Sequence, residues 1–167
     1  MMGISAQGLK DALDSLAQIE PRFADALAAT GYPEARIREP GYSTLLRTIV
    51  GQQVSVAAAA SVWNKLEALL GEGCAPEKLI EQDFDALRAC GLSRQKQGYA
   101  RSLAELVISG ALPLDSMPAD DEEAITYLTQ VKGIGRWSAE IYLLFAEGRG
   151  DIWPAGDLAV QEGVKRI

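Results

Sequence analysis

The chain has 167 residues, of which 48% are hydrophobic, and it carries a formal net charge of −7 at pH 7. This size allows one well-buried core, in a single domain or in two small lobes. Histidine is absent, which excludes Ser–His–Asp and Cys–His catalysis and the usual zinc sites. The acidic balance argues against non-specific coating of DNA, which requires many neutralised phosphates, but it is compatible with one local basic face.

Membrane and export signals are not visible in the sequence. No apolar run is long enough to span a bilayer, and no cleavable N-terminal signal is recognisable. The two cysteines, Cys74 and Cys90, form neither a disulfide framework nor a metal cluster. We therefore expect a cytoplasmic protein without a membrane partner.

Helix signals repeat along the chain and no strand alternation is evident, so we predict an all-α fold. The first helix is predicted from an apolar stripe at helical spacing, formed by Leu9, Leu13, Leu16 and Ile19. Pro21 fits the first turn of a second helix, which Gly31 ends.

Capping side chains predict the starts of most later helices. These predicted caps are Ser43, Ser55, Asp83, Ser93 and Asp120. Pro76 opens another short helix. The last two helices are predicted at residues 137–147 and 158–167. Because the final helix is short and has no visible stop, we expect that a C-terminal portion of the parent protein is missing.

Residues 131–139, with the sequence VKGIGRWSA, predict a glycine turn between two helices. Gly133 and Gly135 have no Cβ, so the backbone can take positive φ and approach another molecule closely. The helix that starts near Arg136 directs free N–H groups and its positive dipole end into the turn, which suits a phosphate. The alternative is a tight connection that needs glycine only for steric reasons.

Asp157 follows a Gly/Pro loop and precedes an apolar helix. A simple N-cap is the more common role for such a residue. The same position keeps a carboxylate ionised, because the helix dipole and the backbone N–H groups favour its charged form. An ionised carboxylate can stabilise a cationic transition state and orient a water molecule.

Two tryptophans and two glutamines have similarly open roles. Trp137 is either a core residue or a surface on which a planar base stacks. Trp153 is either a second stacking surface or, as we favour, the anchor of the loop before Asp157. Gln52 and Gln53 interrupt two helices, either as a solvated connection or as a wedge that fills the space left by an extruded nucleotide.

Four segments, taken in order, resemble the helix-hairpin-helix DNA glycosylase superfamily, and in particular the DNA-3-methyladenine glycosylase II group. They are residues 51–56, 87–96, 131–139 and 151–157. The resemblance implies a two-lobed, all-α fold that is cut short at the C-terminus. One lobe would comprise about residues 1–40 plus 118–167, and the other about residues 41–117.

The resemblance also implies roles for single residues. Asp157 would be the catalytic aspartate, and Trp137 would stack on the flipped base. The residues that bind a DNA phosphate would be Gly133, Ile134, Gly135 and Arg136. Gln53, or else Gln52, would be the duplex wedge. Members of the superfamily often hold Na⁺ or K⁺ in the turn through carbonyl groups, here those of Thr129, Val131 and Ile134, and no other cofactor is expected.

One departure from the superfamily pattern bears on the reaction. Bifunctional members, which also cut the strand, carry a Schiff-base lysine where this chain has Trp137, and tryptophan cannot form that bond. The chain also lacks the four-cysteine cluster of the iron–sulfur members. Both differences imply a monofunctional hydrolase that uses water.

The expected function is therefore base excision repair of double-stranded damaged DNA by a monomeric glycosylase. The enzyme would flip out an alkylated base of the 3-methyladenine or 7-methylguanine type and hydrolyse its N-glycosidic bond. Such a base is already cationic and leaves without a strong general acid, which suits a chain without histidine. The alternatives are a non-catalytic helix-hairpin-helix DNA-binding module and an all-α interaction domain in which Asp157 is only a cap.

Overall fold

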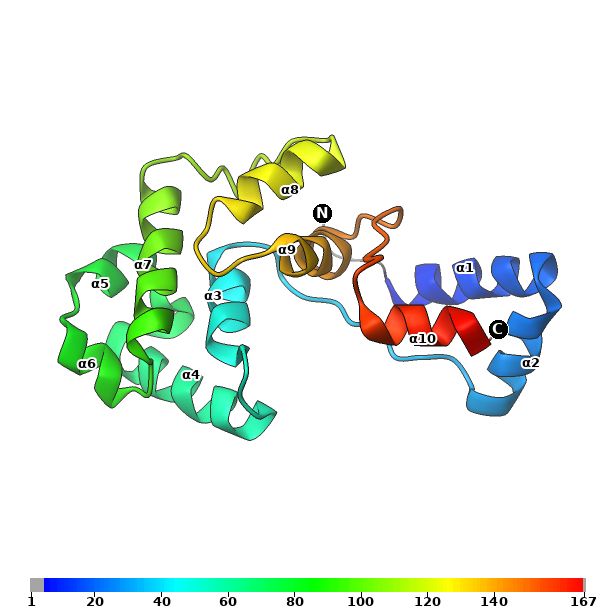
Figure 1. Cartoon of the computed structure of the whole chain (residues 1–167), viewed down its shortest axis with the longest axis horizontal. Helices are drawn as coiled ribbons and strands as arrows, with labels where there is room; N and C mark the ends of the chain where they lie inside the picture. Colours follow the sequence, from blue (N-terminus) through cyan, green and yellow to red (C-terminus); the bar gives the residue numbers. More distant parts are fainter. Residues whose placement is uncertain (1–4, 167) are drawn as a thin grey trace.

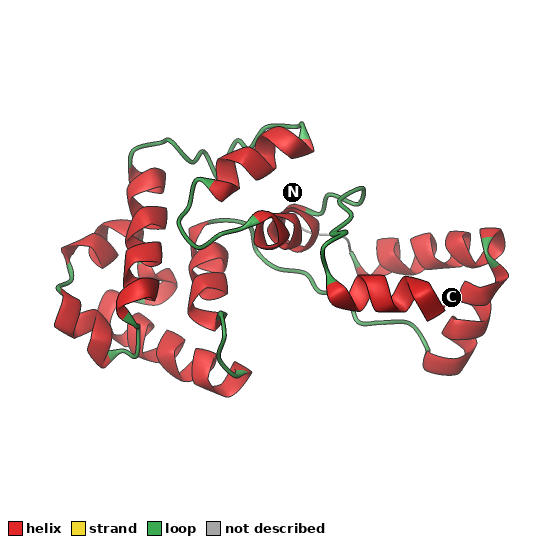
Figure 2. Ribbon diagram, viewed as in Figure 1, coloured by secondary structure: helices red, strands yellow, loops and turns green. Residues whose placement is uncertain are grey.

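The computed structural model describes residues 5–166, which form helices and loops without any strand (Figure 2). The predicted all-α class is confirmed. The elements in chain order are α1 (Ala6–Ile19), α2 (Pro21–Thr30), α3 (Tyr42–Gly51), α4 (Val56–Leu70), the 3₁₀ turn η1 (Glu72–Cys74), α5 (Pro76–Glu81), α6 (Phe84–Ala89), α7 (Arg94–Ile108), α8 (Asp121–Thr129), α9 (Arg136–Tyr142), the π-helical turn η2 (Leu143–Glu147) and α10 (Leu158–Arg166). None of these helices has the length and apolarity that crossing a membrane requires.

The helices fall into two groups with the hairpin between them (Figure 1). Helix α7 packs against α3, α5 and α6, and α3 in turn contacts α9. Helices α1, α2 and α10 lie at the opposite end of the molecule (Figure 1) and contain no buried residue. One hydrophobic core runs from α3 through η2 and includes side chains of α8 and α9. The core thus continues across the predicted boundary near residue 118, and the division into lobes stays a prediction.

Most of the predicted caps are confirmed. The side chains of Ser55, Asp83, Ser93 and Asp120 each accept a hydrogen bond from the backbone N–H three residues further along. Helix α2 starts with Pro21 and ends before Gly31, which has a φ of 74°. These interactions lie within one helical turn, so the local sequence is sufficient to specify them.

The predicted cap at Ser43 is wrong. Helix α3 begins two residues earlier than predicted, after Gly41, which has a φ of 120° and donates its N–H to the Tyr142 hydroxyl at 2.8 Å. Ser43 lies inside the first turn, and its Oγ donates to the Gly73 carbonyl at 2.6 Å. Two long-range hydrogen bonds therefore replace the expected local cap.

Two other expectations need correction, one at the second hairpin helix and one at the end of α1. The second hairpin helix is not one α-helix, because after Tyr142 it widens into the π turn η2, which the Gly148 N–H closes by donating to the Leu143 carbonyl. Ile19, the last member of the predicted apolar stripe, does not contribute to a core, because its side chain is 80% exposed. The last helix is confirmed to Arg166, and Ile167 lies outside the described residues.

Candidate active site

The hairpin turn at residues 130–135 connects α8 to α9 and needs glycine at Gly133. Gly133 has a φ of 84°, and a Cβ built there would lie 2.3 Å from Cδ2 of Tyr99 on α7. Both the backbone conformation and the contact with this ring exclude a side chain. At Gly135, by contrast, nothing lies within 4 Å of the corresponding Cβ position. Gly133 therefore serves the packing of the turn, whereas Gly135 leaves an open surface.

That open surface is the N-terminus of α9. Gly135 is its N-cap and provides no side-chain hydrogen bond, in contrast to the caps of α4, α6, α7 and α8. The first N–H groups of a helix have no partner within the helix and carry its positive dipole end. The Ile134 N–H is engaged in the turn, where it donates to the Val131 carbonyl at 3.0 Å. The phosphate-binding role predicted for residues 133–136 thus falls mainly on Gly135 and the first turn of α9.

The Arg136 side chain connects the two hairpin helices. Its Nε donates to Oε1 of the buried Glu140 at 2.8 Å, and its NH1 donates to Oε2 of Glu122 on α8 at 2.8 Å. The hydrogen bonds from Arg136 lower the pKa of Glu122. With the guanidinium engaged in this way, a phosphate contact at Arg136 is left to its main chain.

The Asp157 carboxylate is half-buried and held through both oxygens. Its Oδ1 accepts the N–H groups of Ala159 at 2.8 Å and Val160 at 3.2 Å, so it caps α10. Its Oδ2 accepts the indole N–H of Trp137 at 2.8 Å. The Trp137 hydrogen bond, together with those from Val160 and Ala159, lowers the pKa of Asp157 below its ordinary value. The cap and the ionised, oriented carboxylate are therefore two roles of one residue.

Trp137 and Trp153 are both exposed, so neither is a core residue or a buried anchor. Trp137 is 49% exposed, so it is not a core residue, and it lines a groove next to the turn. Trp153, favoured as the loop anchor, is 63% exposed. Its neighbours Ile152 and Pro154 are the buried residues of that loop. Trp153 does not anchor the loop.

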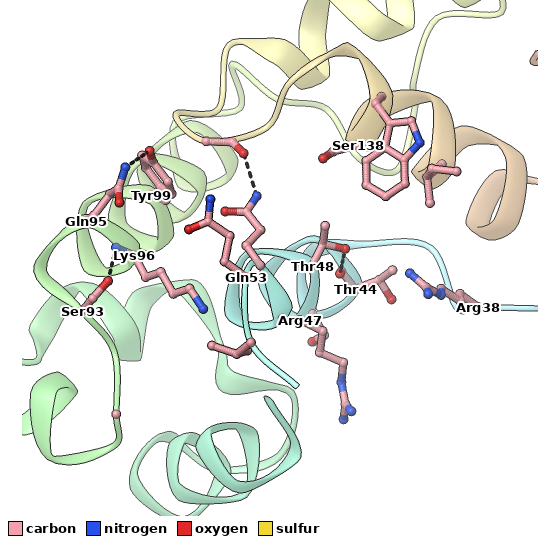
Figure 3. A pocket seen from close by; sticks show the side chains of 18 of the residues that line it. Arg38, Thr44, Arg47, Thr48, Gln53, Ser93, Gln95, Lys96, Tyr99 and Ser138 are labelled. Atoms are coloured by element: carbon pink, nitrogen blue, oxygen red, sulfur yellow. Dashed lines mark hydrogen bonds between the residues drawn. The ribbon is translucent and has the colours of Figure 1, made fainter. Parts of the chain in front are cut away.

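The groove brings together segments that are far apart in the sequence (Figure 3). It is lined by α3, the loop after it, the start of α7, the hairpin turn and α9, and its cationic lining residues are Arg38, Arg47 and Lys96. Lys96 Nζ donates to the Val50 carbonyl near the end of α3 at 2.7 Å, and burial lowers the pKa of this amine. The guanidinium of Arg47 lies 4.0 Å from the centre of the Trp63 ring. A groove with these cations suits a polyanion.

Gln52 and Gln53 lie at the rim of this groove in different conformations. Gln52 donates its side-chain N–H to the Gly133 carbonyl at 2.8 Å. Gln53 is exposed and has a φ of 56°, in the left-handed region that non-glycine residues rarely adopt. Neither residue is part of a fully solvated connection, and the wedge role stays a prediction for both.

The carbonyls predicted to hold a monovalent cation lie at the end of α8 and in the turn. Thr129 ends α8, where the helix dipole is negative. The Val131 carbonyl accepts one hydrogen bond, from Ile134, and keeps a second lone pair. Oxygen donors of this type fit a hard cation. The carbonyl groups are therefore compatible with Na⁺ or K⁺, and the bound ion stays a prediction. Within residues 5–166, no group of three or more cysteine, aspartate and glutamate side chains could hold a metal.

The sequence did not predict which residues of α7 contact the hairpin turn and hold it in place. Tyr99 packs under Gly133, and Ser102 Oγ accepts the Lys132 N–H at 3.2 Å. Glu140, which pairs with Arg136, is only 6% exposed. A glutamate four residues after an arginine is a recognisable helical pair, but no local pattern predicts that Tyr99 and Ser102 meet the turn.

The fold and site define a helix-hairpin-helix protein, in which Gly133 and Trp137 of the hairpin line a groove and Trp137 holds the Asp157 carboxylate. Residues 46–167 match the family described as HhH-GPD superfamily base excision DNA repair protein, and the chain belongs to this family.

Two named relatives align with most of this chain. DNA-3-methyladenine glycosylase 1 of Schizosaccharomyces pombe is 38% identical over 134 residues, covering 78% of this chain and 58% of that protein. DNA-3-methyladenine glycosylase 2 of Escherichia coli K12 is 29% identical over 160 residues, covering 87% of this chain and 56% of that protein. The chain therefore spans less than two thirds of the length of these curated relatives.

Solved structures give the same fold. The S. pombe 3-methyladenine DNA glycosylase in complex with abasic DNA superposes with a TM-score of 0.77 at 33% identity, covering 93% of this chain and 79% of that one. A DNA-3-methyladenine glycosidase from Bacillus halodurans gives a TM-score of 0.81 at 29% identity, covering 99% of this chain and 76% of that one.

Proposed function

We propose that this protein is a monofunctional DNA glycosylase that removes alkylated bases from double-stranded DNA in base excision repair. The observation that carries the proposal is the Asp157 carboxylate, which is held through both oxygens, one of them by the indole N–H of Trp137, a residue that lines the groove. A non-catalytic DNA-binding module needs the open helix end but gives no reason for this carboxylate.

DNA as the partner is supported by the relatives and by the groove. The similar S. pombe structure holds abasic DNA, the kind of product that base release leaves behind. In this chain the first N–H groups of α9 would donate hydrogen bonds to a backbone phosphate, with Arg38, Arg47 and Lys96 along the groove. Gln53, exposed at the rim, is the candidate wedge. A monomer is sufficient for this arrangement.

The proposed chemistry uses Asp157 as the ionised group. Once the nucleotide is extruded, the carboxylate stabilises the positive charge that develops on the sugar and orients the attacking water. The Trp137 ring, exposed on the groove side, provides a surface for a cationic alkylated base. The positively charged base leaves without a protonating side chain. No cofactor is needed for these steps, and a Na⁺ or K⁺ ion in the hairpin would serve only to hold the turn.

Hydrolysis rather than strand cleavage follows from the groups near Asp157. Trp137 has no amine that could attack the sugar. Lys132 is nearby in sequence, but it is five residues before Trp137 and does not line the groove. We therefore expect intact, abasic strands as the product.

The decisive experiment compares the wild-type protein with Asp157→Asn for release of 3-methyladenine and 7-methylguanine from alkylated duplex DNA. Asparagine still caps a helix but carries no charge, so the fold is kept while release falls on the order of 10²- to 10³-fold. Asp120→Asn is the matched control, because Asp120 caps α8 through the Glu123 N–H, and it should leave release unchanged.

Two outcomes would contradict the proposal. Release that survives Asp157→Asn would remove this residue from the reaction. Wild-type protein that binds DNA without releasing any base would instead favour the non-catalytic module.

A further inference from the structure

The hydrogen bond between Gln52 and the hairpin joins two segments 81 residues apart in the sequence. Gln52 follows the last residue of α3, and its side-chain N–H reaches the Gly133 carbonyl at 2.8 Å. A side chain that donates to this carbonyl cannot at the same time enter a duplex. Gln53, one residue later, is exposed and makes no such link within the described residues.

The hairpin turn is thereby held from two directions. From α7, the Tyr99 ring packs under Gly133, and Ser102 accepts the Lys132 N–H. From the end of α3, Gln52 holds the Gly133 carbonyl. The α7 contacts fix the turn to the core, whereas Gln52 links it to the exposed loop that carries Gln53.

The backbone of that loop needs external support. Gln53 adopts a φ of 56°, which is unfavourable for a residue with a side chain and persists only where the surroundings enforce it. The preceding residue is the one fixed to the hairpin. A loop held in one conformation before binding loses less conformational freedom when DNA arrives.

We propose that Gln52 is a positioning residue that sets the distance between the phosphate-binding turn and the wedge loop of residues 52–55. This inference rests on the proposed function. It changes the assignment of Gln52 from an alternative wedge to the link between two DNA-contacting parts.

The first test is amide hydrogen exchange of the free protein, which requires no DNA and no activity. Gln52→Glu replaces the N–H donor by a carboxylate that repels the Gly133 carbonyl, and Gln53→Glu makes the same charge change one residue later. We expect faster exchange in residues 131–137 and in the wedge loop for Gln52→Glu only. Gln52→Met, which keeps the length without a donor, should reproduce the effect, and Gln52→Lys, which restores an N–H donor, should reverse it.

The second test separates positioning from a general loss of structure. In single-turnover base release, Gln52→Glu should raise the half-saturating DNA concentration about five- to tenfold. The maximal rate should stay within about twofold, because the Asp157–Trp137 pair is untouched. A fall in the maximal rate without a change in half-saturation would overturn the positioning role.

The two hypotheses fail in distinguishable ways. Equal hydrogen exchange in Gln52→Glu and Gln53→Glu would overturn the link, even if the protein releases bases normally. Loss of the proposed function would show instead as a wild-type protein without base release, whatever the exchange pattern. If Gln52→Glu does not fold, the exchange comparison between Gln52→Met and Gln52→Lys decides the question.

Discussion

At the scale of single residues, the site depends on Asp157, whose two carboxylate oxygens accept hydrogen bonds from different partners. Oδ1 of Asp157 caps α10, while Oδ2 accepts the Trp137 indole N–H. Every one of these hydrogen bonds favours the charged form and lowers the pKa of Asp157. The ionised Asp157 carboxylate therefore stabilises the fold. This stabilisation is fully present above the unfolded-state pKa of aspartate and is lost as the pH falls through the lower folded-state pKa.

The Trp137 contribution can be removed without removing the ring. Trp137→Phe deletes the largest cause of the lowered pKa, so the titration midpoint of Asp157 should move up toward the ordinary value of aspartate, about 3.9. An NMR titration of the Asp157 carboxyl carbon measures this midpoint. Trp153→Phe is the control, and identical midpoints in the two variants would show that the indole N–H does not hold the carboxylate.

The candidate residues were predictable to different degrees. Both roles of Asp157 were predicted, because a helix N-terminus acts locally on the residue that caps it. The hydrogen bond from Trp137 was not predicted, since it spans 20 residues and depends on where α9 and α10 lie. The exposure of Trp153 could not be inferred either, because the side of an irregular loop that faces the core is decided by its packing.

At the scale of elements, the hairpin contains two glycines that are needed for different reasons. Gly133 is required by its φ of 84° and by the Tyr99 ring. Gly135 has space around it and exposes the start of α9. A Gly-x-Gly pattern alone does not separate these cases, because the difference lies in a contact with α7.

Alanine substitutions should separate the two glycines. Gly133→Ala should destabilise the fold by about 2–4 kcal/mol, since it combines a strained backbone with a clash against Tyr99. Gly135→Ala should cost at most about 1 kcal/mol but should weaken binding to abasic-site duplex DNA, because its methyl group keeps a phosphate away from the helix end. Urea unfolding and DNA titration measure the two effects, and equal losses of stability would contradict this division.

At the scale of the whole molecule, the charge distribution matters more than the net charge. The chain is acidic overall at −7, yet Arg38, Arg47 and Lys96 meet along one groove. They come from the segment before α3, from α3 itself and from α7, so only the fold collects them. An acidic protein can therefore bind DNA through one face.

The contribution of the groove cations to DNA binding should be measurable as the salt dependence of the binding constant. Arg38, labelled at the groove in Figure 3, should contribute one phosphate contact, so Arg38→Ala should reduce the slope of log K against log salt by about one. Arg88→Ala, on the exposed side of α6 away from the groove, is the control. Equal slopes for the two variants would place the DNA elsewhere.

The sequence by itself determined the helices, most of their boundaries, the glycine turn and the capping carboxylate. These features depend on interactions within about one helical turn, which adjacent residues specify completely. Tertiary structure alone decided the contacts of Gly41 with Tyr142 and of Gln52 with Gly133, across 101 and 81 residues. Such contacts arise only once the core has fixed the helices relative to one another, because no periodic pattern encodes which distant side chains will face each other.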